Sequence, residues 1–244
     1  ARRAAERAAL LCKETSAALD LLHVANLAPL ERLRQFMAAT PEALRQRVLD
    51  AAQHKLRELV DLLQTRFGVA AHTHLVTGVL TTELAHQVRS LQADLLVCGA
   101  RGESVVRHLL MGTTALRVLS STPCPVLVVK GPATEPYRHT LVALDLKAGS
   151  EHLLTWGLLG GQSTRMSVFH ALDNQVMRPS AATDHAQPAL SLDERRAAER
   201  QLAQVYLREV IDQHVPPGQA ADIFVAYGEP ARELVSLQSA RGIN

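Results

Sequence analysis

The sequence predicts an α/β protein with parallel sheets, and two observations lead to that prediction. Residues 95–98 and 125–129 are short, continuous apolar runs, which are typical of strands covered on both faces in a parallel sheet. Longer segments with helical periodicity, such as residues 41–67, lie between strands along the chain. Strands that alternate with helices in this way build parallel sheets covered by helices.

The first part of the chain shows this alternation in order. It opens with an alanine-rich segment whose arginines and apolar residues fall on opposite sides of a helix. Thr40-Pro41 then provides an N-cap and a first-turn proline for a long helix. The expected elements are a helix over residues 1–15, a strand over 18–24, a helix over 41–67, a strand over 72–76 and a helix over 81–91.

A loop punctuated by glycines joins the two apolar runs. Gly99 ends the first run, Gly102 follows, and after nine intervening residues Gly112-Thr113-Thr114 opens a short helix. Glycines let a ligand approach the backbone closely, and a helix N-terminus offers unpaired N–H groups that suit a phosphate chain. Each glycine alone is more often an ordinary turn or cap. Together, between two buried strands, they favour a phosphate-binding site.

The spacing Gly99-x-x-Gly102-x9-Gly112-Thr113, followed by the strand Pro-Cys-Pro-Val-Leu-Val-Val, closely resembles the nucleotide-binding signature of the universal stress protein family. The resemblance implies a Rossmann-like, adenine nucleotide alpha hydrolase-like sheet in the order 3-2-1-4-5, with helices on both faces. It also implies ATP, with or without Mg²⁺, between the ends of the first and fourth strands. The implied protein is cytoplasmic and acts in the stress response.

Two further residues belong to the expected site in this part of the chain. Val24 matches a family position that meets adenine through backbone atoms, while its side chain is expected in the core. Arg101 lies between the two loop glycines, where its guanidinium can reach a phosphate or a ribose. An arginine in a solvated loop explains Arg101 equally well.

After a linker at residues 131–139, which contains two prolines, the pattern begins again. Ser191 and Glu194 form the two ends of a capping box that opens a long helix. Gly157 weakens the preceding helix, which is expected over residues 150–159. The expected elements are a strand over 140–145, a helix over 150–159, a strand over 166–171, a helix over 191–214, a strand over 222–227 and a helix over 231–239.

The two halves form an internal repeat. His23 corresponds to His170 at an offset of 147 residues, and Gly78 corresponds to Gly228 at an offset of 150. Carried along the chain, this offset leaves the first repeat without its first strand and the second repeat without its last two. The expected domains are an incomplete first repeat over residues 1–130, a linker over 131–139 and an incomplete second repeat over 140–244.

Asp145 ends the first strand of the second repeat, where the family's adenosine-contacting aspartate stands. An aspartate that caps the next turn is an equal alternative. The glycine loop and Asp145 thus fall in different repeats, so we expect two half-sites, with a strand swap that unites Asp145 and Gly99 as the alternative. The expected nucleotide-binding residues are Val24, Gly99, Arg101, Gly102, Gly112, Thr113, Thr114 and Asp145.

Composition narrows the class of protein. A net charge of +2, with 47% hydrophobic and 20% charged residues, is ordinary for a globular protein and argues against a nucleic-acid surface. No apolar run approaches the roughly 18 residues needed to cross a bilayer, and no signal peptide opens the chain, so we expect no membrane partner. Three cysteines without metal or disulfide spacing are expected to be small apolar residues in a reducing cytosol.

His72-x-His74 places two imidazoles on one face of a strand, and this is the one pattern that suggests a metal. A structural or catalytic zinc needs three or four ligands, and no cysteine or carboxylate cluster lies beside this pair in the sequence. A solvent-facing pair is therefore the preferred interpretation, and no metal or catalytic residue is predicted.

Two functions fit these residues. The first is an ATP-binding sensor or slow hydrolase of the stress response. The second is an interaction module of the same fold that binds no nucleotide and self-associates through the edge of its last strand, residues 125–130. An ATP-consuming ligase of related fold is disfavoured, because residues 146–150 are a weak version of the serine-glycine loop that it needs.

Overall fold

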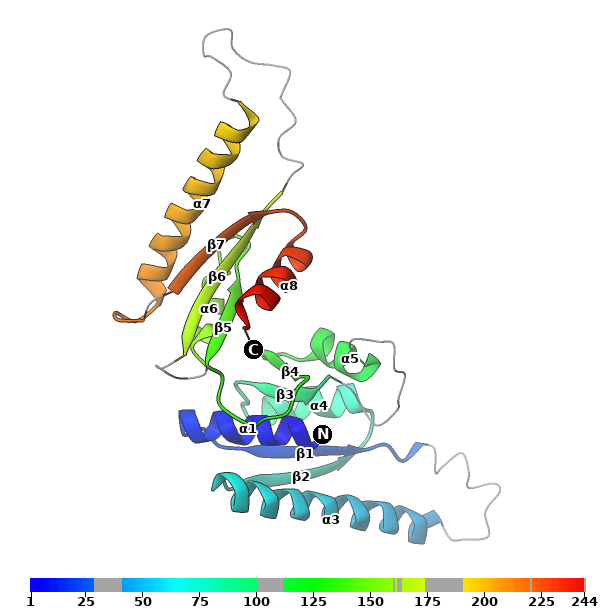
Figure 1. Cartoon of the computed structure of the whole chain (residues 1–244). Helices are drawn as coiled ribbons and strands as arrows, with labels where there is room; N and C mark the ends of the chain where they lie inside the picture. Colours follow the sequence, from blue (N-terminus) through cyan, green and yellow to red (C-terminus); the bar gives the residue numbers. More distant parts are fainter. Residues whose placement is uncertain are drawn as a thin grey trace. The chain divides into compact units, whose positions relative to one another are not determined.

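The computed structural model describes residues 1–28, 41–100, 112–159, 161, 164–173, 191–219 and 221–243. They form two compact units, Ala1–Pro136 and Tyr137–Asn244, and the strands of each unit pair in parallel (Figure 1). The predicted α/β class with parallel sheets is confirmed.

Unit 1 alternates helices and strands in the predicted order. Its sheets are two parallel pairs, β1 with β2 and β3 with β4. The elements are α1 (Arg2–Thr15), β1 (Asp20–Ala25), α3 (Pro41–Phe67), β2 (His72–Thr77), α4 (Leu80–Ser90), β3 (Leu96–Gly99), α5 (Thr113–Ser121) and β4 (Val126–Val129).

Helices cover both faces of these strands. Leu21 of β1 lies in a buried cluster with residues of α1 and α3, including Ala9 and Leu63. Its neighbour Leu22 packs instead against Leu84 and other buried residues of α4 and α5. Successive residues of a strand point to opposite faces, so β1 contributes to a core on each side.

The strand pairs agree with the implied order 3-2-1-4-5, in which β2 and β1 take the first two places and β3 and β4 the last two. Among the described residues, no strand pairs with the second edge of β1 or of β3. Helices connect the two pairs. Helix α1 contacts β3, β4 and α3, and α3 in turn contacts β1 and β2.

Unit 2 contains a three-stranded parallel sheet in the order β5-β6-β7. Figure 1 shows α7 and α8 on opposite faces of this sheet. Because β5 pairs with β6, the alternative in which this strand joins unit 1 is wrong. The elements are β5 (His139–Ala143), α6 (Leu153–Gly157), β6 (Arg165–Leu172), α7 (Leu192–His214), β7 (Ala221–Tyr227) and α8 (Pro230–Arg241).

Gly157 has a packing role that the sequence pattern did not reveal. A Cβ at this position would lie 2.6 Å from Cγ2 of Val142 and 2.8 Å from Sδ of Met166, both of which belong to the buried core. The missing side chain therefore lets the short helix α6 approach the sheet closely. The Thr140 hydroxyl donates a hydrogen bond to the Gly157 carbonyl at 2.6 Å and holds this end of the helix.

The predicted capping box is present at the start of α7. The Ser191 hydroxyl accepts a hydrogen bond from the Glu194 N–H at 3.2 Å, and the Glu194 carboxylate accepts one from the Ser191 N–H at 2.8 Å. These reciprocal bonds satisfy two of the backbone donors at the helix start. The Ser191 hydroxyl and N–H also hold the pKa of Glu194 below its usual value, because hydrogen bonds to its carboxylate stabilise the charged form.

The two units share one turn in detail. Gly78 follows β2 with φ of +152°, and Gly228 follows β7 with φ of +148°. In each turn the glycine N–H bonds back to the neighbouring strand, to the carbonyl of Ala25 in unit 1 and of Leu172 in unit 2. A positive φ of this kind favours glycine, so the repeated glycine has the same backbone cause in both units.

Candidate functional site

The glycine loop begins where β3 and β4 end. β3 stops at Gly99, and the N–H of the buried Ala100 donates to the Val129 carbonyl at 2.9 Å, which extends the parallel ladder by one bond. The Gly112 N–H then donates to the Ala100 carbonyl at 2.8 Å. The start of α5 is therefore held directly beside the carboxyl end of β3.

An open pocket of about 400 Å³ lies at this edge of the sheet. Three of its residues are basic, and they come from the first turn of α1 and from the end of β4. Ligands of open α/β sheets bind beyond the carboxyl ends of the strands, which is where this pocket lies. The lining residues are Ala1, Arg2, Arg3, Ala4, Gly99, Ala100, Val129 and Lys130.

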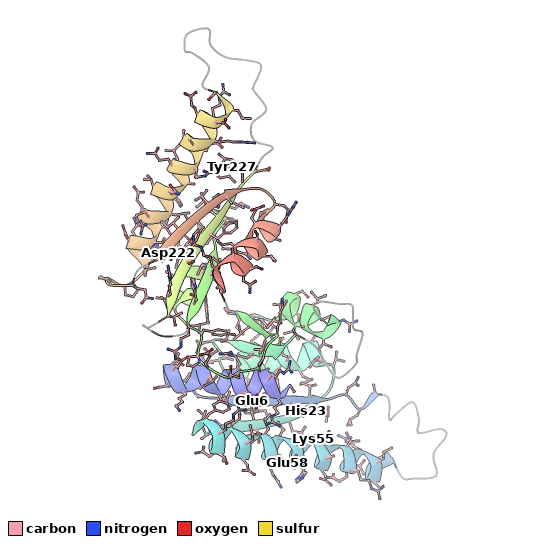
Figure 2. The ribbon with its side chains drawn as sticks, viewed as in Figure 1. Glu6, His23, Lys55, Glu58, Asp222 and Tyr227 are labelled. Atoms are coloured by element: carbon pink, nitrogen blue, oxygen red, sulfur yellow. The ribbon has the colours of Figure 1, made fainter. Side chains whose placement is uncertain are left out.

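Side-chain contacts fix the first turn of α1 beside the pocket. The Arg3 guanidinium reaches the Lys130 carbonyl at 3.5 Å. The Arg2 Nε donates to the Glu6 carboxylate at 3.1 Å, and the Arg66 guanidinium of α3 donates to the same oxygen at 2.9 Å. The side chain of Glu6, labelled in Figure 2, is only 8% exposed and so ties α1 to α3.

Among the described residues, no side chain caps the backbone donors in the first turn of α5. Gly112 is its N-cap with φ of −71° and ψ of 152°, angles that any residue can adopt. The backbone angles of Gly112 therefore do not by themselves require glycine at this position. The N–H groups of Thr113, Thr114 and Ala115 have no intrahelical acceptor because of their place in the helix.

The predicted site residues have different outcomes. Gly99 lines the pocket, and Gly112, Thr113 and Thr114 lie at the start of α5 beside the end of β3. Val24 is a half-buried residue of β1 paired with Val76, and it is not among the pocket residues. Arg101 and Gly102 lie outside the described residues.

Asp145 belongs to unit 2 and follows β5, which ends two residues before it. Its carboxylate accepts a hydrogen bond from the Lys147 N–H at 3.2 Å and lies 3.4 Å from the Lys147 ammonium. The backbone hydrogen bond is the main reason that the pKa of Asp145 lies below its usual value. In this structure Asp145 thus caps the next turn, which is one of the two roles expected for it.

Sequence reasoning missed the three basic residues of the pocket, Arg2, Arg3 and Lys130. Lys130 directly follows an apolar strand, which is a signal for a charge at the carboxyl edge of a sheet. Arg2 and Arg3 carry no such signal, because only the fold brings the first turn of α1 to the ends of β3 and β4.

The cysteines agree with the expectation of small apolar residues. Cys12, Cys98 and Cys124 are free and half-buried, and burial is the main cause that raises the pKa of each thiol. A raised pKa keeps a thiol protonated and unreactive near neutral pH.

In the described parts of the chain, no helix is both long and apolar enough to span a membrane.

The chain is similar to known universal stress proteins. A sequence model of the universal stress protein family matches residues 1–130. Universal stress protein MJ0531 of Methanocaldococcus jannaschii is 30% identical over 132 residues, which cover 54% of this chain and 76% of that protein. Universal stress protein YxiE of Bacillus subtilis is 24% identical over 132 residues, which cover 52% of this chain and 89% of that protein.

A solved structure shares the fold. The crystal structure of a universal stress protein from Archaeoglobus fulgidus aligns with a TM-score of 0.66 at 14% sequence identity, over 99% of this chain and 79% of that chain. At this level of identity the likeness concerns the fold alone.

Proposed function

The chain belongs to the universal stress protein family, and we propose that its first unit binds ATP at the carboxyl ends of β3 and β4. The triphosphate would lie against the Gly99–Thr114 loop and the first turn of α5. Arg2, Arg3 and Lys130 would neutralise part of its charge, and Mg²⁺ would accompany it. Membership of the family itself gives the chain a general role in the stress response.

The contact between Gly112 and Ala100 carries this proposal. Because the Gly112 N–H bonds the Ala100 carbonyl at 2.8 Å, the uncapped N-terminus of α5 opens at the same edge as the pocket. A helix N-terminus combines unpaired N–H groups with a favourable dipole, and both stabilise a bound phosphate. The three basic pocket residues add charge of the right sign.

The proposed role is that of a sensor or slow hydrolase in the cytoplasm. No described residue that lines the pocket forms a nucleophile with an adjacent base. In unit 2, Asp145 would belong to a half-site for adenosine, as the sequence predicts.

Substitution of Gly112 tests the phosphate site. Gly112→Val places a branched side chain at the N-cap of α5, where the phosphates would lie, and is expected to weaken ATP binding about ten- to a hundredfold. The matched control is Gly131→Val, since Gly131 is exposed and a Cβ there would meet nothing within 4 Å. Isothermal titration calorimetry with ATP, with and without Mg²⁺, measures both variants. Equal affinity of the wild-type chain and Gly112→Val, or no ATP binding by the wild-type chain at millimolar concentration, contradicts the proposal.

Self-association through β4 is a second candidate function, because one specific observation favours it. β4 pairs with β3 on one edge, and no described strand pairs with its other edge. Leu116 and Leu119 of the neighbouring helix α5 are 53% and 41% exposed. An apolar edge strand of this kind is prone to pair with a second copy.

The ladder identifies a substitution that blocks only the outer edge of β4. Leu96 donates to Pro125 and Ala100 donates to Val129, so residues 127 and 129 point their N–H groups toward β3. The Val128 N–H points outward, and Val128→Pro removes it without loss of a β3–β4 bond. We expect this variant to be monomeric where the wild-type chain is dimeric in sedimentation velocity. A wild-type chain that stays monomeric at about 50 µM, well above typical weak-dimer constants, excludes this candidate.

A further inference from the structure

Three side chains with metal-ligand chemistry meet at the amino end of the β1–β2 sheet. Asp20 is the first residue of β1, and His72 is the first residue of β2, directly opposite it in the register. His74 pairs with Leu22, two residues further along. Side chains two residues apart on a strand share a face, so Asp20, His72 and His74 project from the same face of the sheet.

Both imidazoles lie close to one carboxylate oxygen of Asp20. His74 Nε2 lies 2.7 Å from Asp20 Oδ1, and His72 Nδ1 lies 3.8 Å from the same oxygen. The Asp20 and His74 side chains are 32% and 27% exposed, so they are held against the sheet, while His72 is 79% exposed and can turn. The sequence revealed the histidine pair but not the carboxylate, which comes from a strand about fifty residues earlier.

We propose that Asp20, His72 and His74 bind a divalent transition-metal ion, with Zn²⁺ as the best match. Two imidazoles and one carboxylate are ligands that Zn²⁺ accepts, and three protein ligands leave a fourth position open for water or another small ligand. As the side chains lie in the described part of the chain, no group of three His, Cys, Asp or Glu side chains, these three included, could hold a metal ion. The site therefore forms when the exposed His72 ring turns toward the ion.

The observed spacing suits this rearrangement. Zinc bonds of about 2.1 Å at tetrahedral angles place neighbouring ligand atoms about 3.4 Å apart. The two nitrogen–oxygen distances of 2.7 and 3.8 Å lie on either side of that value. An ion between the three groups would lengthen the first distance and shorten the second by rotation of the side chains.

The corresponding place in unit 2 has one carboxylate and no histidine. The residues of β6 and β7 that correspond to Asp20, His72 and His74 are Ser167, Asp222 and Phe224. Asp222, labelled in Figure 2, pairs with the Arg165 guanidinium, whose Nε lies 3.0 Å from its carboxylate. In the described residues, the ion-pair partners of Asp20 are two imidazoles, and no lysine or arginine is among them. The carboxylate of unit 1 can therefore exchange its hydrogen bond to His74 for a cation.

Zinc titration of the full chain tests the proposal. Isothermal titration calorimetry with ZnCl₂, in a buffer that does not chelate and without nucleotide, is expected to show one saturable site. His72→Gln, His74→Gln and Asp20→Asn each remove one ligand and are expected to weaken zinc binding at least about tenfold, since even supporting groups around a metal cost that much. Co²⁺ in place of Zn²⁺ adds a visible absorption band that reports the ligand geometry.

His54→Gln is the matched control. His54 lies 3.3 Å from Glu58 on the surface of α3 and forms a two-residue pair without a third ligand. Its substitution is expected to leave the zinc affinity unchanged. Because His72 is highly exposed, His72→Gln keeps the fold, and an unchanged far-UV circular dichroism spectrum verifies this. Equal zinc affinity of the wild-type chain and the His72→Gln and Asp20→Asn variants overturns the proposal, as does a wild-type chain without a saturable site.

Discussion

Strands β1 and β6 take corresponding places in the two units, yet they differ in burial. Five consecutive residues of β6 are buried, from Met166 to His170, whereas only Leu21 and Ala25 of β1 are buried. β6 lies between β5 and β7, while β1 pairs with β2 alone among the described residues. The comparison teaches that neighbouring strands, and not the strand's own sequence, set how deeply it is buried.

His23 and His170 show this difference with the same residue type. His170 is buried, and its Nδ1 donates to the Leu144 carbonyl at 2.8 Å, just beyond the end of β5. His23, at the corresponding position of β1, is exposed. A strand beside β6 thus turns a solvent-facing imidazole into a buried hydrogen-bond donor.

The largest expected effect comes from the core of β6. Phe169 is 3% exposed, and Phe169→Ala is expected to cost about 3–5 kcal/mol of unfolding free energy in unit 2. Leu22→Ala, at the corresponding half-buried position of β1, should cost less than half as much in unit 1. Trp156, the single tryptophan, lies in unit 2, so its fluorescence during urea unfolding follows that unit. Hydrogen exchange of β1 amides follows unit 1, and equal losses in the two units would contradict the comparison.

The corresponding histidines His23 and His170 provide a second test of the comparison. His170→Ala leaves the Leu144 carbonyl without its donor and should destabilise unit 2 by about 1–3 kcal/mol. His23→Ala removes an exposed side chain and should change the stability of unit 1 by no more than about 0.5 kcal/mol. Trp156 fluorescence during urea unfolding measures the loss in unit 2, and hydrogen exchange of the β1 amides measures that in unit 1. A large loss in His23→Ala would mean that another strand covers β1 in solution.

Substitution of the glycine in the shared turn should reduce the stability of both units by a similar amount. This is a case in which the two units are expected to agree. Gly78→Ala and Gly228→Ala each impose a positive φ on a residue with a side chain, at a cost of about 1 kcal/mol or more. A Cβ would also lie 2.7 Å from the Glu83 carboxylate in unit 1 and 2.9 Å from that of Glu233 in unit 2. Urea unfolding and hydrogen exchange measure the loss in each unit, and a loss confined to one of them would show that the two turns are not equivalent.

The smallest effect concerns Tyr227, which unit 1 replaces with Thr77. Burial, followed by the Glu199 carboxylate 2.7 Å from the phenol, raises the pKa of Tyr227 to about 12 (Figure 2). A raised pKa means that the protonated phenol stabilises the fold below about pH 10, its unfolded pKa, and that this stability is lost as the pH rises toward 12.

Tyr227→Phe should therefore remove a pH-dependent part of the stability of unit 2. Between pH 9 and pH 11, the expected difference from the wild-type chain is on the order of 1 kcal/mol or less, because the group is partly solvated. Urea midpoints from Trp156 fluorescence measure it. Identical pH profiles of the two proteins would show that burial and Glu199 do not raise the pKa of Tyr227.

The sequence by itself determined most of the secondary structure. Continuous apolar runs identified β3 and β4, Thr40-Pro41 identified the start of α3, and Ser191 with Glu194 identified that of α7. These signals are local, since apolar runs, helix caps and glycine turns are formed by residues close together in the chain. For the same reason the sequence located the glycine loop and, through it, the family.

Only the tertiary structure decided which distant residues meet. It placed Arg2 and Arg3 beside Lys130, assigned Asp145 to the cap of its own turn, and brought Asp20 to His72 and His74. It also explained Gly157 through Val142 and Met166, which approach it from the sheet. Such contacts depend on strand register and helix packing, which join segments tens of residues apart, and no local pattern of residues encodes them.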